Sequence, residues 1–180
     1  MRNKGKRKSG DRVLAEGKFL RLIERGSWEF VERTNCSGIV IILALTKERK
    51  IIFIEQYRVP VDKKVIEFPA GLIDDLAPLR AKETFVRAAK RELLEETGYS
   101  ARTIRKITQG PVSGGLCADQ AIICQALGLR KISEGGGDPT EAIIVHEVPL
   151  EKATSWLNKM RKKGCLVDPK VYMGLYFFTV

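Results

Sequence analysis

The sequence contains few of the side chains that most metal and nucleophile sites use. Its 180 residues include one histidine and four cysteines. No Cys-x-x-Cys pair occurs and no histidine lies near a cysteine at metal-ligand spacing, which argues against a zinc site and a redox motif. We interpret the cysteines as reduced, mostly buried thiols: Cys36, Cys117, Cys124 and Cys165. A Ser-His-Asp triad would have to use His146, and the apolar segment around that residue favours a packed strand histidine instead.

Long apolar runs are also missing. No run approaches the roughly 18 residues that a membrane-spanning helix needs, so we predict no membrane span. The basic start of the chain is followed by no apolar stretch with a small-residue cleavage site, so we expect no secretory signal and a cytoplasmic protein. Residues 1–12 are expected to be a basic tail and residues 13–180 a single domain, a size that can bury a full core.

A net charge of +10 would be typical of a nucleic-acid binding protein if the charge were spread over one surface, so its position in the chain matters. Nine of the ten charges lie in two short runs, the N-terminal tail and residues 159–163. We interpret them as a solvated tail and the polar end of a helix. A basic protein attracts phosphate-bearing molecules of any kind, so the charge does not separate a small nucleotide from RNA. The chain lacks the aromatic-and-basic motif of an RNA-recognition sheet, which makes nucleic acid the less favoured partner.

The pattern of apolar residues predicts an α/β fold. Alternation over residues 13–24 and 28–35, separated by a Gly26-Ser27 turn, predicts an N-terminal antiparallel hairpin. Further strands are predicted at residues 38–45, 51–57, 65–68, 103–109, 121–126 and 142–148. Helices are predicted at residues 81–97, 150–163 and from 169 to the C-terminus. This order indicates a central mixed sheet with helices on its faces.

Three glutamates are grouped on the helix predicted at residues 81–97. Glu92, Glu95 and Glu96 are spaced by three and four residues, so they share one narrow arc, where like charges repel by a few tenths of a kcal/mol per pair, roughly. Arg91 could compensate them as an ordinary solvated face. Three apolar residues occupy the same arc one turn earlier, which indicates a packed face: Phe85, Ala88 and Ala89. A hard cation such as Mg²⁺ would neutralise carboxylates in such a place.

These residues carry a resemblance to a known family. The segment Arg-Glu-Leu-Leu-Glu-Glu-Thr-Gly-Tyr at residues 91–99 resembles the second half of the Nudix box at every fixed position, and Glu83 lies where the box has its earlier glutamate. The family has five residues between its glycine and that glutamate, whereas eleven separate Gly71 from Glu83 here. We expect an insertion of about six residues within 75–82; the other alignment puts Ala77 in place of the glycine.

The resemblance implies a Nudix fold, an α/β/α sandwich around a central mixed sheet. It also implies that Glu92, Glu95, Glu96 and the Ala70 carbonyl bind two or three Mg²⁺ or Mn²⁺ ions, while Arg91 orients the glutamates. Such ions neutralise phosphate charge and lower the pKa of a bound water, which becomes the nucleophile. The helix offers no base to take the proton of that water.

Flanking segments, from about residue 28 to 157, resemble the branch of the family that hydrolyses ADP-ribose and other nucleoside diphosphate sugars. The resemblance implies that Trp28 stacks on the nucleobase, often across a homodimer, with the hairpin 13–35 at the interface. It makes Arg58 a diphosphate or ribose contact. Alternatively, Trp28 is a half-buried strand aromatic and Arg58 an exposed strand-end arginine. Three further substrate-binding candidates lie in the matching segments: Glu29, Arg33 and Asp119, the last in place of the family's glutamate.

The missing general base is expected in the loop at residues 134–141. Related enzymes supply a base from a mobile loop at this position, and a glycine-rich loop can carry a carboxylate to the water. Glu141 is the first choice and Glu134 the second. A plain solvated loop is the alternative interpretation of either residue.

The resemblance thus implies metal-dependent hydrolysis of a nucleoside diphosphate sugar, such as ADP-ribose or GDP-mannose, to a nucleoside monophosphate and a sugar phosphate. Two alternatives remain. The first is a Nudix hydrolase of nucleoside triphosphates or capped RNA ends, which the basic runs would favour. The second is a non-catalytic regulator that binds ADP-ribose or RNA, although such a protein would be expected to have lost its glutamates or gained a DNA-binding module.

Overall fold

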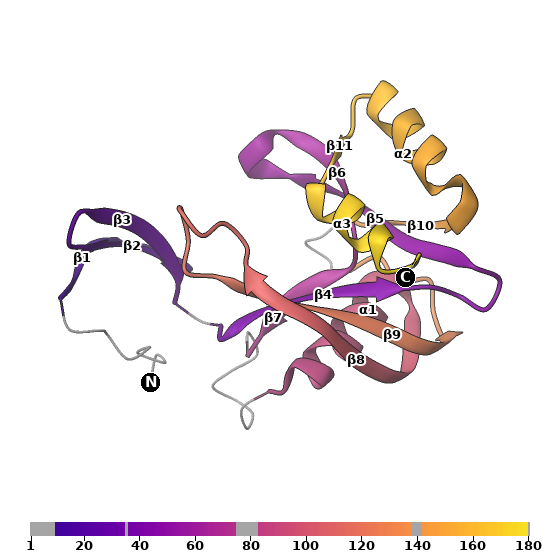
Figure 1. Ribbon diagram of the computed structural model, residues 1–180, viewed down its shortest axis with the longest axis horizontal. Coiled ribbons are helices and arrows are strands. Elements are labelled where there is room, and N and C mark those ends of the chain that lie inside the picture. The colour runs from indigo at the N-terminus through magenta and orange to yellow at the C-terminus, as the bar shows by residue number, and fades with distance from the viewer. Residues whose placement is uncertain (1–9, 35, 75–82, 138–141, 180) are drawn as a thin grey trace.

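The strands form three sheets, with helices on two sides of the central pair (Figure 1). The computed structural model describes residues 10–34, 36–74, 83–137 and 142–179. An N-terminal antiparallel sheet contains β1 (Asp11–Glu16), β2 (Leu20–Arg25) and β3 (Trp28–Arg33). A second sheet has the order β7 (Ala70–Ile73), β4 (Gly38–Ala44), β9 (Gln120–Lys131) and β8 (Tyr99–Pro111). The third has the order β10 (Ile144–Pro149), β5 (Lys50–Arg58), β6 (Lys63–Glu67) and β11 (Leu166–Val167).

The helices are α1 (Phe85–Thr97), α2 (Ala153–Lys162) and α3 (Pro169–Tyr176), with two short 3₁₀ helices, η1 (Val59–Val61) and η2 (Leu150–Lys152). Each four-stranded sheet is mixed, because β4 and β9 run parallel in one and β6 and β11 in the other, while the remaining pairs are antiparallel. The predicted α/β class is therefore confirmed. Where one central mixed sheet was predicted, the structure has two four-stranded mixed sheets.

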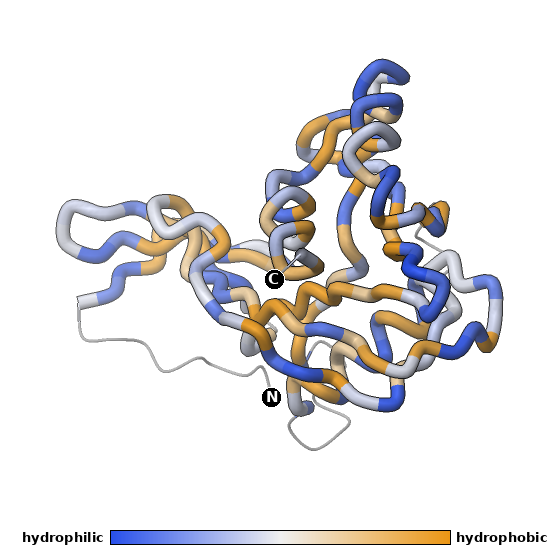
Figure 2. The backbone as a smooth tube through the Cα atoms, turned by 45° about the vertical axis from the view of Figure 1, so that its right-hand side comes forward, coloured by the Kyte–Doolittle hydropathy of each residue, from blue (hydrophilic) through white to orange (hydrophobic). Residues whose placement is uncertain are grey.

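Strands β4 and β5 are buried on both faces, which places them at the centre of the fold. Ile41 of β4 and Phe53 of β5 belong to an apolar cluster completed by α2 and α3. Their neighbours Val40 and Ile52 point the other way, into a cluster that contains Leu93 of α1. Burying an aliphatic side chain of this size contributes about 1.5–3 kcal/mol. Because neighbouring residues of these strands point to opposite faces, α1 packs on one side of the sheets and α2 and α3 pack on the other. Figure 2 shows the apolar residues concentrated along these central strands.

Helix α1 begins later than the sequence predicts. Thr84 is extended and its side chain accepts a hydrogen bond from the Arg87 N–H, so it is the N-cap. Residues 83 and 84 therefore lie outside the helix, and residues 81 and 82 lie outside the described part of the chain. The predicted end is confirmed, because Gly98 adopts the left-handed conformation (φ 72°) and its N–H donates to the Leu94 carbonyl.

The N-terminal sheet has one strand more than predicted. A turn closed by the Gly17 N–H and the Leu20 carbonyl (2.8 Å) divides the strand expected at residues 13–24 into β1 and β2. Strand β1 begins at Asp11 and so includes two residues of the expected tail. The sheet projects from the rest of the molecule at the left of Figure 1. Among the described residues, no helix covers either of its faces.

Two short strands were missed, and two strands are longer than predicted by several residues. Strand β7 forms by pairing with β4 in a segment where no strand was predicted, and β11 adds two residues in parallel to β6. Strands β8 and β9 extend to 13 and 12 residues as one long hairpin with an irregularity between Lys106 and Thr108. No helix in the described ranges is long and apolar enough to cross a membrane.

Candidate active site

The glutamate arc of α1 faces a cleft of about 630 Å³. Seven of the predicted site residues line it: Arg33, Arg58, Ala70, Arg91, Glu92, Glu95 and Glu96. Strand β7 forms the wall next to the helix, the end of β5 supplies Arg58, and β3 supplies Arg33. The structure thus brings together side chains that lie more than 60 residues apart in sequence.

Arg91 connects the acidic residues to one another. Its Nη1 donates to Glu92 (2.7 Å) and Glu95 (3.3 Å), and its Nε and Nη2 donate to the two carboxylate oxygens of Glu83 (3.3 Å each). Its Nη2 also donates to the Leu72 carbonyl (3.1 Å), which ties the helix to β7. The rigid guanidinium fork can serve several acceptors at once, which an ammonium group cannot do with the same geometry.

Strand β7 lies directly against the glutamates. The Ala70 N–H donates to Glu96 Oε2 (3.0 Å), and Glu96 is only 4% exposed. A Cβ at Gly71 would collide with the carboxylate carbon of Glu92, so this position accepts only glycine without displacing that carboxylate. The close approach of strand and helix therefore fixes where the carboxylates of Glu92 and Glu96 lie.

The donor set fits a hard divalent cation, which prefers carboxylate oxygens. Glu92, Glu95 and Glu96 all line the same cleft, and Glu95 is half exposed. In the described part of the chain, no three acidic, cysteine or histidine side chains already converge at metal-binding distance. Arg91 engages Glu92 and Glu95 instead. Glu92, Glu95 and Glu96 are thus the residues that would hold such an ion, next to the backbone of Ala70.

Three cationic side chains of the cleft are each paired with a carboxylate. Arg58 Nε contacts Glu67 (2.7 Å), Arg33 Nε contacts Asp119 (3.1 Å), and Lys170 Nζ contacts Asp168 (2.5 Å). Asp119, predicted to bind substrate, reaches the cleft only through Arg33, since it is not part of the lining. A phosphate group entering the cleft would compete with these carboxylates for the three cations.

Three polar residues that line the cleft were given no role from the sequence: Gln56, Glu67 and Lys170. Lys170 comes from α3, beyond the segment that carries the family resemblance, so no motif marked it. Gln56 is 9% exposed, and its Oε1 atom has no hydrogen-bond partner among the described residues. Buried acceptors are normally satisfied, so this amide is available to a ligand.

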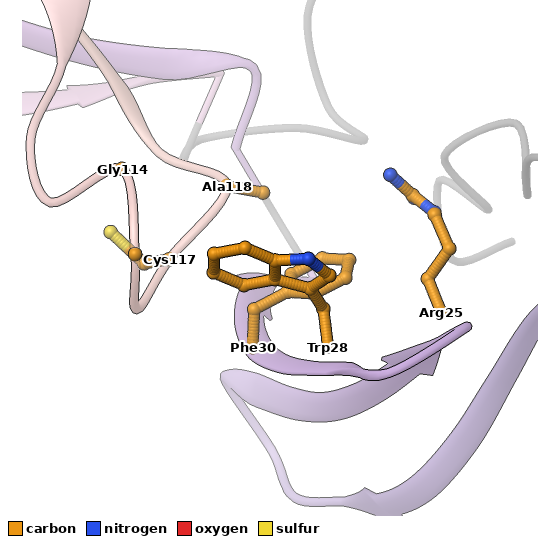
Figure 3. A pocket seen from close by; sticks show the side chains of 7 residues that line it. Arg25, Trp28, Phe30, Gly114, Cys117 and Ala118 are labelled. Atoms are coloured by element: carbon orange, nitrogen blue, oxygen red, sulfur yellow. The ribbon is translucent and has the colours of Figure 1, made fainter.

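Trp28 lies outside the cleft, in a second pocket of about 320 Å³. Figure 3 shows its ring in front of that of Phe30, with Arg25 on one side and the loop that carries Cys117 on the other; all of them line the pocket. The loop is held against β3, because the Val31 N–H donates to Leu116 O (2.9 Å) and the Ala118 N–H donates to Val31 O (2.9 Å). Trp28 lies on strand β3 and is 63% exposed.

Two of the remaining candidates do not line the cleft. Glu29 is exposed on β3, and Glu134 is exposed in the segment after β9. Glu141, the first choice as general base, lies outside the described residues.

His146 is a packed strand residue, as predicted. Its Nε2 lies 3.0 Å from Glu55 Oε2, and its ring lies against Trp156 of α2 (4.9 Å between centroids). Burial raises the pKa of Glu55, but hydrogen bonds from Lys64 and His146 outweigh burial and lower it. All four cysteines are thiols rather than disulfides. Cys124 and Cys165 are buried, while Cys36 and Cys117 are partly exposed, so the prediction of mostly buried thiols held for only half of them.

Comparison with known proteins agrees with this geometry. A family model described as a NUDIX domain matches residues 36–161, which include the whole glutamate arc. The chain belongs to the Nudix family. It is 32% identical over 144 residues to a methanol dehydrogenase activator from Bacillus methanolicus, covering 79% of this chain and 72% of that protein. It is 38% identical over 117 residues to an ADP-ribose pyrophosphatase from Bacillus subtilis, covering 64% of this chain and 60% of that protein.

The fold has a counterpart among solved structures. A crystal structure of an ADP compounds hydrolase superposes with a TM-score of 0.61 at 20% identity, covering 81% of this chain and 80% of the other. The match supports the Nudix fold. Nudix proteins are pyrophosphohydrolases that generally use divalent metal ions, and α1 supplies carboxylates of the kind such ions need.

Proposed function

We propose that this Nudix protein hydrolyses the diphosphate linkage of a nucleoside diphosphate sugar. The observation that carries the proposal is the meeting, in one cleft, of the Arg91-held glutamates with the side chains of Arg58, Lys170 and Arg33. Carboxylates alone would suit a metal, and cations alone would suit an anion. Their combination suits a metal-bound diphosphate. The 38% identity to a protein named ADP-ribose pyrophosphatase supports the same substrate class.

Glu92, Glu95 and Glu96 would hold two or three Mg²⁺ or Mn²⁺ ions together with the Ala70 carbonyl. When bound, such ions neutralise phosphate oxygens and supply a nucleophilic water near neutral pH. Arg91 orients the carboxylates, since it contacts two of them directly. Removing it would leave these glutamates to repel one another.

Arg58, Lys170 and Arg33 would bind the phosphates by exchanging their carboxylate partners for phosphate oxygens. Gln56 Oε1 would accept a hydrogen bond from a substrate hydroxyl, because it lines the cleft and lacks a partner in the described structure. The attacking water adds to one phosphorus, the bridging P–O bond breaks, and the proton of the water passes to a base. Glu141 or Glu134 is the candidate base.

Trp28 would stack on the nucleobase, as an exposed aromatic ring beside Phe30 can do for any base. Asp119 would hold Arg33 in place. Glu29, a further candidate contact, lies on β3 together with Arg33. We propose a homodimer in which the N-terminal sheet is at the interface. Exposed apolar side chains on that sheet and in its β1–β2 turn support the proposal: Leu14, Phe19 and Leu20.

A substrate panel tests the proposed class. Purified protein with Mg²⁺ would be given ADP-ribose, GDP-mannose, UDP-glucose, GTP and capped RNA, and the products separated by chromatography. We expect a nucleoside monophosphate and a sugar phosphate in equal amounts from at least one nucleotide sugar. Preferential turnover of GTP or capped RNA would contradict the substrate class while retaining the diphosphate chemistry. No turnover of any compound would overturn the proposal.

A further inference from the structure

The segment that follows β9 turns back onto the C-terminal end of α1. The Ile132 and Ser133 N–H groups donate to the Gly98 carbonyl (2.7 and 3.2 Å). The Gly136 N–H then donates to the Glu96 carbonyl (2.9 Å), and the Gly137 N–H donates to the Glu95 carbonyl (3.0 Å). The last carbonyls of a helix have no partner within it. Residues 132–137 therefore cap the turn of α1 that carries two of the cleft glutamates.

Gly135 is the residue that permits this approach. Its φ is +74°, and a Cβ there would lie 2.6 Å from Gly98 N and 2.7 Å from Glu96 O. Both are backbone atoms, which cannot swing aside as the end of a flexible side chain can. Any other residue at 135 would thus push the segment away from the helix and break the hydrogen bonds to Glu95 and Glu96.

We propose that Gly135 is a positioning residue that sets the affinity of the glutamate arc for divalent metal. By closing residues 132–137 on the end of α1, it keeps the last helical turn from fraying, and fraying would move the carboxylates of Glu95 and Glu96. The inference rests on the proposed function, because it requires those carboxylates to bind metal.

The coupling has to act in both directions. If the hydrogen bonds to the Glu95 and Glu96 carbonyls strengthen metal binding, then bound metal strengthens those hydrogen bonds by the same factor. The coupling can therefore be tested in two ways: by the metal affinity of a variant in the segment at residues 132–137, and by the effect of metal on the hydrogen bonds of that segment.

The first test compares Gly135→Ala with Gly164→Ala. Gly164, which follows α2, also has a positive φ (+93°), but a Cβ there would meet nothing within 4 Å. Both variants suffer the backbone strain, and only Gly135→Ala collides with the end of α1. Mn²⁺ binding to the substrate-free protein would be measured by electron paramagnetic resonance. We expect Gly135→Ala to raise the Mn²⁺ dissociation constant about 10-fold, and Gly164→Ala to stay close to the unmodified protein.

Equal effects in the two variants would overturn the positioning role. If the unmodified protein binds Mn²⁺ normally but Gly135→Ala does too, only this inference fails. If the unmodified protein binds no Mn²⁺, the proposed function fails with it. The two failures are therefore distinguishable.

The second test uses the unmodified protein, in case Gly135→Ala does not fold. Hydrogen exchange of the Gly136 and Gly137 amides would be measured with and without Mg²⁺. We expect Mg²⁺ to slow both, while the Gly17 amide, which donates within the N-terminal sheet, stays unchanged. Exchange at Gly136 and Gly137 that does not respond to Mg²⁺ would overturn the inference.

Discussion

Arg91 holds more of the candidate site together than any other side chain in the described cleft. It contacts Glu83, Glu92, Glu95 and the backbone of β7, and it is 15% exposed. Because one planar group makes all of these contacts, the helix, the strand and the segment before the helix share a single fixed point.

Replacing Arg91 by lysine keeps the charge and removes the fork. We expect kcat to fall by about 100-fold, since small displacements of reacting groups cost that much. The matched control is Arg87→Lys, an exposed position on the same helix, which should leave kcat unchanged. Steady-state kinetics with ADP-ribose measure both. Equal activity of Arg91→Lys and Arg87→Lys would show that the fork does not orient the glutamates.

Lys170 offers a test of substrate binding outside the region matched by the family model. Lys170→Ala should raise KM by about 10-fold with a smaller change in kcat, because the lost contact is made in both ground and transition states. Lys159→Ala, on the exposed side of α2, should alter neither constant. An unchanged KM for Lys170→Ala would remove this residue from the binding site.

Substitutions of Trp28 distinguish a role in base stacking from a role in packing the fold. Because its side chain is 63% exposed, Trp28→Ala should leave the unfolding temperature unchanged. It should weaken nucleotide binding by about 1–3 kcal/mol, the usual value of one stacked base. Trp28→Phe should recover most of this binding, since it restores an aromatic face. A loss that Phe does not restore, or no loss at all, would contradict stacking.

At the scale of elements, the features that depend mainly on local sequence were largely predicted. The central strands were predicted from their apolar runs, and the end of α1 from Gly98. The start of α1 was missed because Thr84 acts through its side-chain hydrogen bond to Arg87, a feature that helix propensity alone does not report. Strand β7 was missed because only its pairing with β4 makes it a strand.

The candidate site divides in the same way. The glutamates and Arg91 lie within one helix, so their spacing in the sequence was enough to predict them as site residues. Lys170 reaches the cleft from a different helix, and the contact of Gly135 with the end of α1 joins segments that are distant in sequence. Such placements depend on how the sheets pack, which no local pattern encodes.

The contacts of Glu55 on β5 with Lys64 of β6 and His146 of β10 make stability depend on pH. Glu55 has a lowered pKa in the folded protein, so its ionised form stabilises the fold above the ordinary carboxyl pKa. That contribution is lost as the pH falls below roughly 4. We expect Glu55→Gln to lower the free energy of unfolding at pH 7 and to lose less stability than the unmodified protein on acidification. Urea unfolding at both pH values measures this. Parallel losses in the two proteins would contradict it.

At the scale of the whole molecule, the N-terminal sheet is the part least explained by the single chain. It projects from the other two sheets (Figures 1 and 2). Several of its apolar side chains are exposed. Burial of such a surface between two copies would stabilise it and would bring the Trp28 pocket of one copy near the other.

Sedimentation velocity tests the proposed dimer. Leu20→Lys places a charge on the N-terminal sheet, and we expect it to convert the dimer into a monomer. Leu166→Lys is the control, because Leu166 is about as exposed (45% against 44%) but lies on β11. A protein that is monomeric without any substitution would contradict the dimer, as would equal behaviour of the two variants.

The central claim is that the glutamates of α1 would hold the divalent metal needed for hydrolysis of a diphosphate, and Glu96→Gln tests it most directly. Turnover of ADP-ribose would be measured across a Mg²⁺ titration, with Glu151→Gln, an exposed glutamate of η2, as the control. Glu96→Gln should remain folded and lose at least about 100-fold in Mg²⁺-dependent turnover, more than the loss of an outer-shell partner causes, while Glu151→Gln keeps full activity. Full Mg²⁺-dependent activity in Glu96→Gln would contradict the account.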